Sequence, residues 1–285
     1  YNMVSLITGG SGFVSSNLLQ KMPDALLLDI REPFIDKKKF VNRDISVEFD
    51  IEDDLESVVH LAALSGLQAC NEDPDQAYKT NVLGTKNVLE LCRKKDAKII
   101  FASSFAVYGF PNVYSLTKTA GEWLCQQYGE KYGLKYSILR FANLYGENYH
   151  AKPVWNVVHT FIQNIVDGNP SLLIHGDGDQ TRDFVYVQDL VEKILNEIKS
   201  KNSGVFDVCT TIQNSINSFA NAIVDVATKN NLSKPKIEYG PTPSFRKETI
   251  QLLDKYLANP LECKTSLDVG LANTFDYAIK YNSKN

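Results

Sequence analysis

The segment YSLTK places Tyr114 and Lys118 four residues apart, a spacing that suits acid–base chemistry. Residues four apart are neighbours on one face of a helix. A phenol titrates at about pH 10, and its pKa must fall by about three units, roughly 4 kcal/mol, before it acts as a base near neutral pH. A neighbouring ammonium group lowers that pKa. The pair therefore indicates a tyrosine base activated by a lysine, although the same spacing also occurs in ordinary surface pairs.

Two serines precede this pair, at the end of a strongly apolar run. Ser103 and Ser104 lie in the segment FASSFAVYG. Substrates of parallel sheets bind at the carboxyl ends of the strands. A serine hydroxyl at such an end can hydrogen-bond the substrate oxygen from which Tyr114 removes a proton. The alternative is that the two hydroxyls only satisfy the turn that follows the strand.

A glycine-rich turn near the N-terminus predicts a dinucleotide site. The segment TGGSGFVSSNL follows an apolar run and opens a predicted helix, which is the context such a site requires. Gly9 permits a tight turn. Gly12 lets the backbone approach a pyrophosphate, which the free N–H groups and dipole of the helix stabilise. The alternative for this short pattern is a loop of small residues.

The carboxylate at the end of the second predicted strand decides which dinucleotide is expected. Asp29 stands twenty positions after Gly9, where a carboxylate accepts hydrogen bonds from the adenine ribose. Such a carboxylate repels a 2′-phosphate, so the sequence favours NAD over NADP. Arg31 is the residue that could hold that phosphate instead. Asp50 and Ile51, after the next strand, are expected to flank the adenine.

The first half of the chain alternates apolar runs with helical spacing. Strands are predicted over 4–7, 25–29, 58–62, 98–102 and 136–140, and helices over 81–94 and 114–132. This alternation predicts an α/β fold with a doubly wound parallel sheet of the Rossmann type. Helical stretches over 154–166 and 216–229 are separated by loops and predict a smaller α/β substrate-binding domain. We expect a cofactor domain over 1–145, to which the segment 184–210 returns, and a substrate domain over 146–285.

Composition and charge exclude several classes of function. The net charge of -4 argues against a nucleic-acid-binding face. No apolar run approaches the roughly 18 residues that span a bilayer, and no signal segment is recognised. Neither the cysteines nor the four histidines cluster as metal ligands do. We therefore expect a cytoplasmic protein with no metal site, whose thiols are reduced. The thiols belong to Cys70, Cys92, Cys125, Cys209 and Cys263.

Seven ordered motifs resemble the extended short-chain dehydrogenase/reductase family, in its nucleotide-sugar epimerase/dehydratase branch. They run from Val4 to about Val191 and read TGGSGFVSSNL, VVHLAAL, NVLGTKNVLE, FASSFAVYG, YSLTK, LRFANLYG and GDGDQTRDFVYVQDLV. The resemblance implies NAD as cofactor, a nucleotide-diphosphate sugar as substrate, and 4-epimerisation through transient oxidation at C4. A 4-ketoreductase or a dehydratase of the same family is the alternative, and a non-catalytic nucleotide-binding module is a third. Phe105 and Ala106 stand where dehydratases carry an Asp-Glu pair and decarboxylases a glutamate, which favours the epimerase.

The same resemblance assigns roles to individual residues. Catalysis would fall to Ser104, Tyr114 and Lys118. NAD would be held by the residues Gly9, Gly12, Phe13, Val14, Asp29, Asp50, Ile51, Leu61, Ala62, Ala63, Tyr114 and Lys118. The substrate would contact Ser104, Asn143, Arg182 and Arg246. The planar guanidinium groups suit diphosphate oxygens, although surface salt bridges would explain both arginines as well.

Family members of this branch form homodimers through the two helices that correspond to 81–94 and 114–132. The resemblance therefore implies a homodimer, with the four helices of two chains packed as a bundle. The apolar residues Leu89, Trp123 and Leu124 would support such an interface. They could equally belong to the core of one chain.

The sequence departs from the family pattern in three places. Ser15 replaces the third glycine of the turn, so we expect a small outward shift of the helix, weaker cofactor binding and a hydroxyl bonded back to the helix backbone. The segment FDIEDDLESVVHLAA leaves no room for the usual helix between the third and fourth strands. The interval from Ser104 to Tyr114 is also short: either its loop is trimmed, or the sequence lacks residues of a flexible lid. The length of the interval favours the second explanation.

Overall fold

The computed structural model describes residues 3–34, 39–109, 111–149, 157–232, 234–242 and 257–282. Contacts between residues divide the chain into two compact units. The first comprises Tyr1–Phe141, Val191–Val208 and Leu257–Leu261, and the second comprises Ala142–Leu190, Cys209–Tyr256 and Glu262–Asn285. Of the segment expected to return to the first unit, the part over 191–208 does so.

The first unit is built on an eight-stranded sheet whose order is β14-β11-β6-β5-β4-β1-β2-β3. Its strands are β1 (Val4–Thr8), β2 (Leu26–Asp29), β3 (Phe40–Asn42), β4 (Leu55–His60), β5 (Lys98–Ser104), β6 (Tyr136–Phe141), β11 (Gly204–Cys209) and β14 (Leu261–Glu262). Every pairing from β3 through β11 is parallel. Strand order reverses beside β1, as in doubly wound sheets. The predicted Rossmann-type sheet is confirmed, and no helix lies between β3 and β4.

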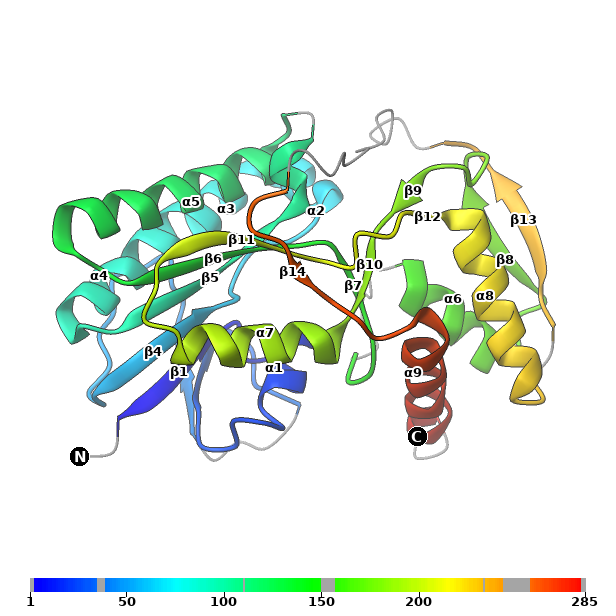
Figure 1. The fold of residues 1–285 in the computed structure, drawn as a ribbon, viewed down its shortest axis with the longest axis horizontal. Coiled ribbons are helices and arrows are strands. Elements are labelled where there is room, and N and C mark those ends of the chain that lie inside the picture. The colour runs from blue at the N-terminus through cyan, green and yellow to red at the C-terminus, as the bar shows by residue number, and fades with distance from the viewer. Residues whose placement is uncertain are drawn as a thin grey trace. The chain divides into compact units, whose positions relative to one another are not determined.

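Helices cover both faces of this sheet. Figure 1 shows α3 (Pro74–Tyr78), α4 (Thr85–Lys95) and α5 (Val113–Tyr132) on one face, and α1 (Phe13–Leu18) and α7 (Val187–Lys199) on the other. Because both faces of the sheet are covered, its central strands β1, β4 and β5 are buried along nearly their whole length rather than at alternate residues. Strand β5 is buried along all but its last residue.

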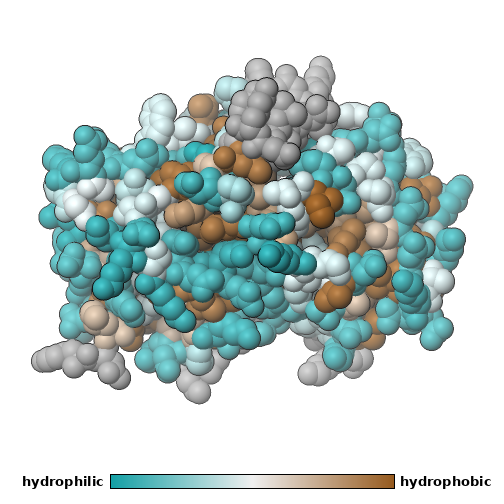
Figure 2. Space-filling model, in the orientation of Figure 1, coloured by the Kyte–Doolittle hydropathy of each residue, from teal (hydrophilic) through white to brown (hydrophobic). Residues whose placement is uncertain are grey.

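Close packing on the sheet also depends on small residues in the helices. A Cβ atom added at Gly121 of α5 would come within 2.4 Å of the Phe101 ring. Side chains of α7 follow the usual helical division, with Val187, Leu190, Val191 and Ile194 buried. Polar side chains cover the outward face of that helix (Figure 2).

The helix that carries Tyr114 and Lys118 has well-defined ends. Asn112 caps its first turn by accepting from Ser115 N at 3.0 Å, and the Ser115 hydroxyl accepts from Asn112 N at 2.9 Å. This reciprocal pair is a capping box. The helix ends at Gly133, whose φ of 71° favours glycine. The predicted helix over 114–132 is therefore confirmed. The one predicted over 81–94 begins as a π-helix, η1 (Lys79–Gly84), and continues as α4.

The second unit is a smaller α/β assembly. Its strands form three two-stranded sheets, β7 (Asn143–Tyr145) with β10 (Phe184–Tyr186), β9 (Thr181–Arg182) with β12 (Asn214–Ser215), and β8 (Ser171–His175) with β13 (Lys236–Gly240). Its helices are α6 (Val157–Val166), α8 (Ile216–Lys229) and α9 (Leu267–Asn282). Buried aromatic rings of Tyr145, Phe184 and Phe219 pack together in its core. The helix predicted over 216–229 is confirmed.

The structure also describes the cysteines and the apolar character of the helices, on which the composition led to expectations. All five cysteines are buried and free of disulfides. Within the described ranges, no helix combines the length and the apolar character that crossing a bilayer requires.

Candidate active site

Three residues of the first unit converge at the carboxyl end of β5. Ser104 is the last residue of that strand, and Tyr114 and Lys118 lie in the first two turns of α5. The Ser104 side chain lies close enough to Tyr114 to lower the pKa of its phenol. The ammonium nitrogen of Lys118 lies 5.9 Å from the centre of the Tyr114 ring. The fold therefore brings the three predicted catalytic residues together.

Lys118 is buried against the sheet. Its Nζ donates to the carbonyl oxygen of Ala102 at 2.8 Å and lies 5.3 Å from the centre of the Phe101 ring. Burial lowers the pKa of Lys118 to about 8, while Cys70 and Glu122 raise it. At neutral pH this side chain therefore still carries its positive charge.

Tyr114 differs from what the sequence predicted. Burial raises the pKa of Tyr114 to about 12, and the nearby Ser104 side chain opposes that rise. Lys118 directs its ammonium group to Ala102 rather than to the phenol, so its charge does not overcome burial. The residues of the chain therefore keep the phenol protonated at neutral pH.

The glycine turn between β1 and α1 has the shape that a dinucleotide requires. Gly9 adopts a φ of 72°, and a Cβ added to it would lie 2.7 Å from Ala62 N. A Cβ on Gly12 would lie 3.1 Å from the carbonyl oxygen of Gly9. A side chain at Gly9 would overlap the backbone of Leu61 and Ala62, so the close approach of the turn to this segment requires glycine. Gly12 is the N-cap of α1, and a helix N-terminus is where a pyrophosphate binds. Phe13, Val14, Leu61, Ala62 and Ala63 border the turn and are partly exposed.

Asp29 ties the end of β2 to this turn. Its Oδ2 accepts from Ser11 N at 3.0 Å, and its Oδ1 accepts from Arg31 N at 2.9 Å. The Arg31 side chain is 71% exposed, with Nε 4.0 Å from Oδ1. Asp50 is exposed and accepts from Ile51 N, whereas Ile51 is buried in the apolar core. The turn and Asp29 together fit the phosphate and ribose portions of NAD.

The second unit holds two of the predicted substrate residues close to one another. Asn143 donates to the carbonyl oxygen of Asp183 from its backbone N at 3.0 Å and from Nδ2 at 3.2 Å. The neighbouring Arg182 donates from Nη1 to the carbonyl oxygen of Thr181 at 2.7 Å. Arg246, the other predicted arginine, lies outside the described residues.

Comparison with known proteins identifies the family. Residues 5–209, well over half of the chain, match the model of the NAD dependent epimerase/dehydratase family. This chain belongs to that family.

Individual relatives of this epimerase/dehydratase chain agree with the assignment. A putative UDP-glucose 4-epimerase of Methanocaldococcus jannaschii is 37% identical over 76% of this chain and 80% of its own length. UDP-glucuronic acid decarboxylase 1 of Danio rerio is 28% identical over 95% of this chain and 72% of its own. The crystal structure of UDP-glucose 4-epimerase with UDP-glucose from Thermotoga maritima is 25% identical, with a TM-score of 0.83 over 98% of this chain and all of that one. The chain is accordingly an enzyme of an NAD-dependent family.

Ser15, which departs from the family pattern, is bonded differently from the prediction. Its hydroxyl donates to the carbonyl oxygen of Gly9 at 2.6 Å, in the turn that precedes the helix, rather than to the backbone of the helix itself. Ser15 is 1% exposed. The serine therefore ties the first turn of α1 to the start of the glycine turn.

The short interval between Ser104 and Tyr114 is bridged by local structure. A 3-10 helix, η2 (Phe105–Tyr108), follows β5 directly, and Ser104 caps it by accepting from Ala106 N at 3.1 Å. The cap of α5 begins at Asn112. Eight residues, 105–112, connect the strand to the helix, and all of them except residue 110 are described.

Sequence reasoning missed several residues around the site. The sequence indicated only that Cys70 carries a reduced thiol, yet this thiol lies close enough to influence the pKa values of both Lys118 and Tyr114. Burial raises the pKa of that thiol. Glu122 and Arg140 form a buried ion pair beside Ser103. The spacing of Lys118 and Glu122 on one helix was a signal that could have indicated the carboxylate, but nothing in the sequence placed Arg140 opposite it.

Proposed function

We propose that this protein is an NAD-dependent nucleotide-sugar 4-epimerase, acting on UDP-glucose and UDP-galactose or their N-acetyl analogues. The observation that carries the proposal is the convergence of Ser104, Tyr114 and Lys118 at the carboxyl end of β5, in a chain of this family. The names of the relatives support it, since 4-epimerases of UDP sugars occur among both the sequence and the structural matches.

Each catalytic side chain has a definite task in this reaction. Tyr114 takes the proton of the sugar 4-hydroxyl, and Ser104 hydrogen-bonds the same oxygen. The glycine turn and Asp29 would hold NAD, which when bound would supply a hydride acceptor for C4 and a positive charge that lowers the phenol pKa that burial raises. Lys118 remains an ammonium group and stabilises the phenolate. Once the 4-keto sugar has turned over, so that the other face of C4 receives the hydride, Tyr114 gives the proton back to O4.

The two compact units divide the binding tasks in this proposal. The first unit binds NAD through the glycine turn and Asp29, and the second binds the nucleotide sugar. Arg182 and Asn143 contact the diphosphate, for which the fork of a guanidinium group is suited. Arg246 is the second arginine in the proposal. The buried thiols agree with a cytoplasmic location.

The decarboxylase relatives define the alternative reaction. A dehydratase or a decarboxylase of this family carries a carboxylate immediately after the catalytic serine. Here Phe105 and Ala106 occupy those positions, and Phe105 is buried. Because η2 offers no acid at that point, epimerisation at C4 is the better-supported reaction.

Incubation with UDP-glucose and with UDP-N-acetylglucosamine tests the proposal, with inversion at C4 followed by NMR. The Tyr114→Phe variant is expected to lose at least about 100-fold in kcat, the usual contribution of a general acid–base residue, while it retains NAD. Tyr132→Phe, an exposed tyrosine on the same helix, is the control and should not change turnover. A Tyr114→Phe variant that inverts C4 at the wild-type rate would contradict the proposal. A binding module would turn over no sugar nucleotide at all.

A homodimer through α5 is the second part of the proposal. Leu116 and Trp123, seven residues apart on that helix, are 49% and 70% exposed. Leu89 belongs to the buried core and Leu124 packs partly against it, so Trp123 is the one of the three suggested residues that is available to a partner. Sedimentation velocity should give twice the mass of one chain, and a single-chain mass at micromolar concentration would argue against the dimer.

A further inference from the structure

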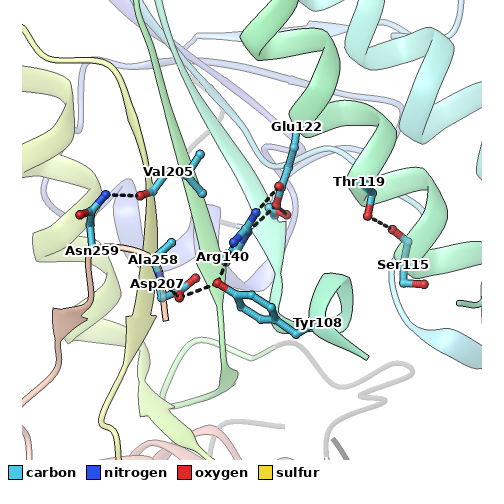
Figure 3. Close-up of polar contacts among 10 residues, drawn as sticks. Tyr108, Ser115, Thr119, Glu122, Arg140, Val205, Asp207, Ala258 and Asn259 are labelled. Atoms are coloured by element: carbon cyan, nitrogen blue, oxygen red, sulfur yellow. Dashed lines mark hydrogen bonds and ion pairs between the residues drawn. The ribbon is translucent and has the colours of Figure 1, made fainter. Parts of the chain in front are cut away.

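A buried ion pair between Arg140 and Glu122 contacts Ser103, the residue that precedes the catalytic serine (Figure 3 shows the pair). Arg140 on β6 donates to Glu122 on α5 twice, from Nε to Oε1 at 2.8 Å and from Nη2 to Oε2 at 2.6 Å. The side chains are 17% and 3% exposed. Two parallel bonds to one carboxylate fix the plane of the guanidinium group. The pair is therefore a rigid support between strand and helix.

This support holds the chain on both sides of Ser104. On one side, the hydroxyl of Ser103 donates to Glu122 Oε1 at 2.5 Å. On the other, Arg140 Nη1 donates to the hydroxyl of Tyr108 at 2.7 Å, and the guanidinium carbon lies 4.8 Å from the centre of the Tyr108 ring. Tyr108 is the last residue of η2, and Ser104 is the cap of the same turn.

The Tyr108 hydroxyl is oriented by a second partner as well. It donates to Asp207 Oδ2 on β11 at 2.7 Å, and the same carboxylate oxygen accepts from Ala258 N at 2.5 Å. The hydroxyl thus accepts from a cation and donates to an anion. Bonds that involve charged groups are stronger than those between neutral groups. Three elements of the sheet and its helix layer, β6, β11 and α5, therefore determine where η2 ends.

We infer that Tyr108 is a positioning residue for the reaction: by fixing the end of η2, it holds the Ser104 hydroxyl in the orientation that meets Tyr114. The inference rests on the proposed epimerase function. Ser104 accepts from Ala106 N within η2, so a displacement of this turn moves the serine oxygen directly. Small misplacements of a catalytic group cost a large part of the rate, whereas the hydrogen bonds that hold the glycine turn come from Asp29, Ser15 and their neighbours and not from η2.

The variant Tyr108→Phe tests the inference, because it keeps the ring and removes only the hydroxyl. We expect kcat to fall by about tenfold, with KM changed less than about twofold and NAD affinity unchanged. Amide hydrogen exchange over 104–109 should become faster, which measures the turn without reference to activity.

Tyr128→Phe is the matched control. Tyr128 also lies in the first unit, on α5, and its hydroxyl also donates to a carboxylate, that of Glu90. It should lose comparable stability but leave kcat and the exchange over 104–109 unchanged. If Tyr108→Phe keeps the wild-type kcat, or if its exchange over 104–109 matches that of wild type, the positioning role is wrong.

A second comparison asks whether Tyr108 acts through Ser104. In a Ser104→Ala background, Tyr108→Phe is expected to cause no further loss in kcat, because the group that it positions is gone. An equal loss in both backgrounds would overturn the inference. Absence of turnover in the wild-type protein would instead reject the proposed function, and the hydrogen-exchange comparison would still decide whether Tyr108 holds the turn.

Discussion

Asp29 combines two tasks in one carboxylate. Each of its oxygens accepts one backbone bond, from Ser11 N and from Arg31 N, which joins β2 to the glycine turn. A carboxylate oxygen can accept more than one bond, so capacity remains for the two ribose hydroxyls of NAD. The negative charge at this position also opposes a 2′-phosphate, while the exposed Arg31 side chain attracts one.

Replacing this carboxylate should change cofactor choice. We expect Asp29→Asn to weaken NAD binding by about 10- to 100-fold, since hydrogen bonds to charged groups contribute about 1.5–3 kcal/mol. NADP binding should weaken less or improve, because the repelling charge is removed. Isothermal titration with both nucleotides measures the ratio of the two affinities. Asp24→Asn, at the exposed opposite end of β2, is the control, and an unchanged ratio in Asp29→Asn would contradict the assignment.

At the scale of elements, Ser15 joins α1 to the turn that precedes it. The third glycine of the family pattern would offer no side-chain bond at this point. Here the Ser15 hydroxyl donates to the Gly9 carbonyl, in a turn where Gly9 already adopts a left-handed conformation. The bond restricts the turn before any ligand arrives, and a preorganised turn binds at a lower entropic cost.

Removal of that hydroxyl is expected to loosen the turn. Ser15→Ala should weaken NAD binding by about 2- to 10-fold, as expected for one neutral hydrogen bond of about 0.5–1.5 kcal/mol, and should lower Tm. Thr274→Val removes a similar buried hydroxyl, which donates to the Gly270 carbonyl at 2.7 Å in α9. That control should lower Tm without changing the affinity for NAD. Equal NAD affinity in Ser15→Ala and wild type would contradict the role of the bond.

At the scale of the whole molecule, a chain of hydrogen bonds through His60 links β1, β4 and η1. Thr8 Oγ1 lies 2.7 Å from His60 Nδ1, and His60 Nε2 lies 3.0 Å from Thr85 Oγ1. Thr85 donates its own proton to the carbonyl oxygen of Asn81 at 2.6 Å. The proton between His60 and Thr85 must therefore sit on Nε2. Burial, assisted by the charge of Lys118, lowers the pKa of His60 to about 3.

This neutral histidine makes the stability of the protein depend on pH. Between pH 6.5 and about 3, the unfolded chain binds a proton at His60 that the folded chain does not, so the free energy of unfolding falls as pH falls through this window. His159, whose pKa burial lowers to about 4, acts in the same direction.

Urea unfolding between pH 4.5 and 7 tests this dependence. We expect His60→Gln to be less stable at pH 7 but to show a flatter pH profile, with a slope near pH 5 reduced by about 1.4 kcal/mol per pH unit, the value for one proton. The exposed His175→Gln variant is the control and should keep the wild-type slope. Parallel profiles for His60→Gln and wild type would show that His60 titrates normally in the folded protein.

Taken alone, the sequence determined the features that depend on neighbours along the chain. Apolar runs, glycine turns and the spacing of Tyr114 and Lys118 are local patterns, and they predicted the parallel sheet, the helix over 114–132 and the family. Only the tertiary structure decided what packs against these elements. Asp207 meets Tyr108 across 99 positions of sequence, and such a pairing follows from strand order rather than from any local pattern.

Burial was the other property that local patterns left open. Leu89 became core while Trp123 stayed exposed, although both have an apolar side chain and lie on a helix. Tyr114 kept a raised pKa because packing removed water from the phenol and directed Lys118 to a backbone carbonyl. Spacing along one helix places two groups on the same face, but the free energy of their charges depends on the atoms that surround them, and those are supplied by the rest of the fold.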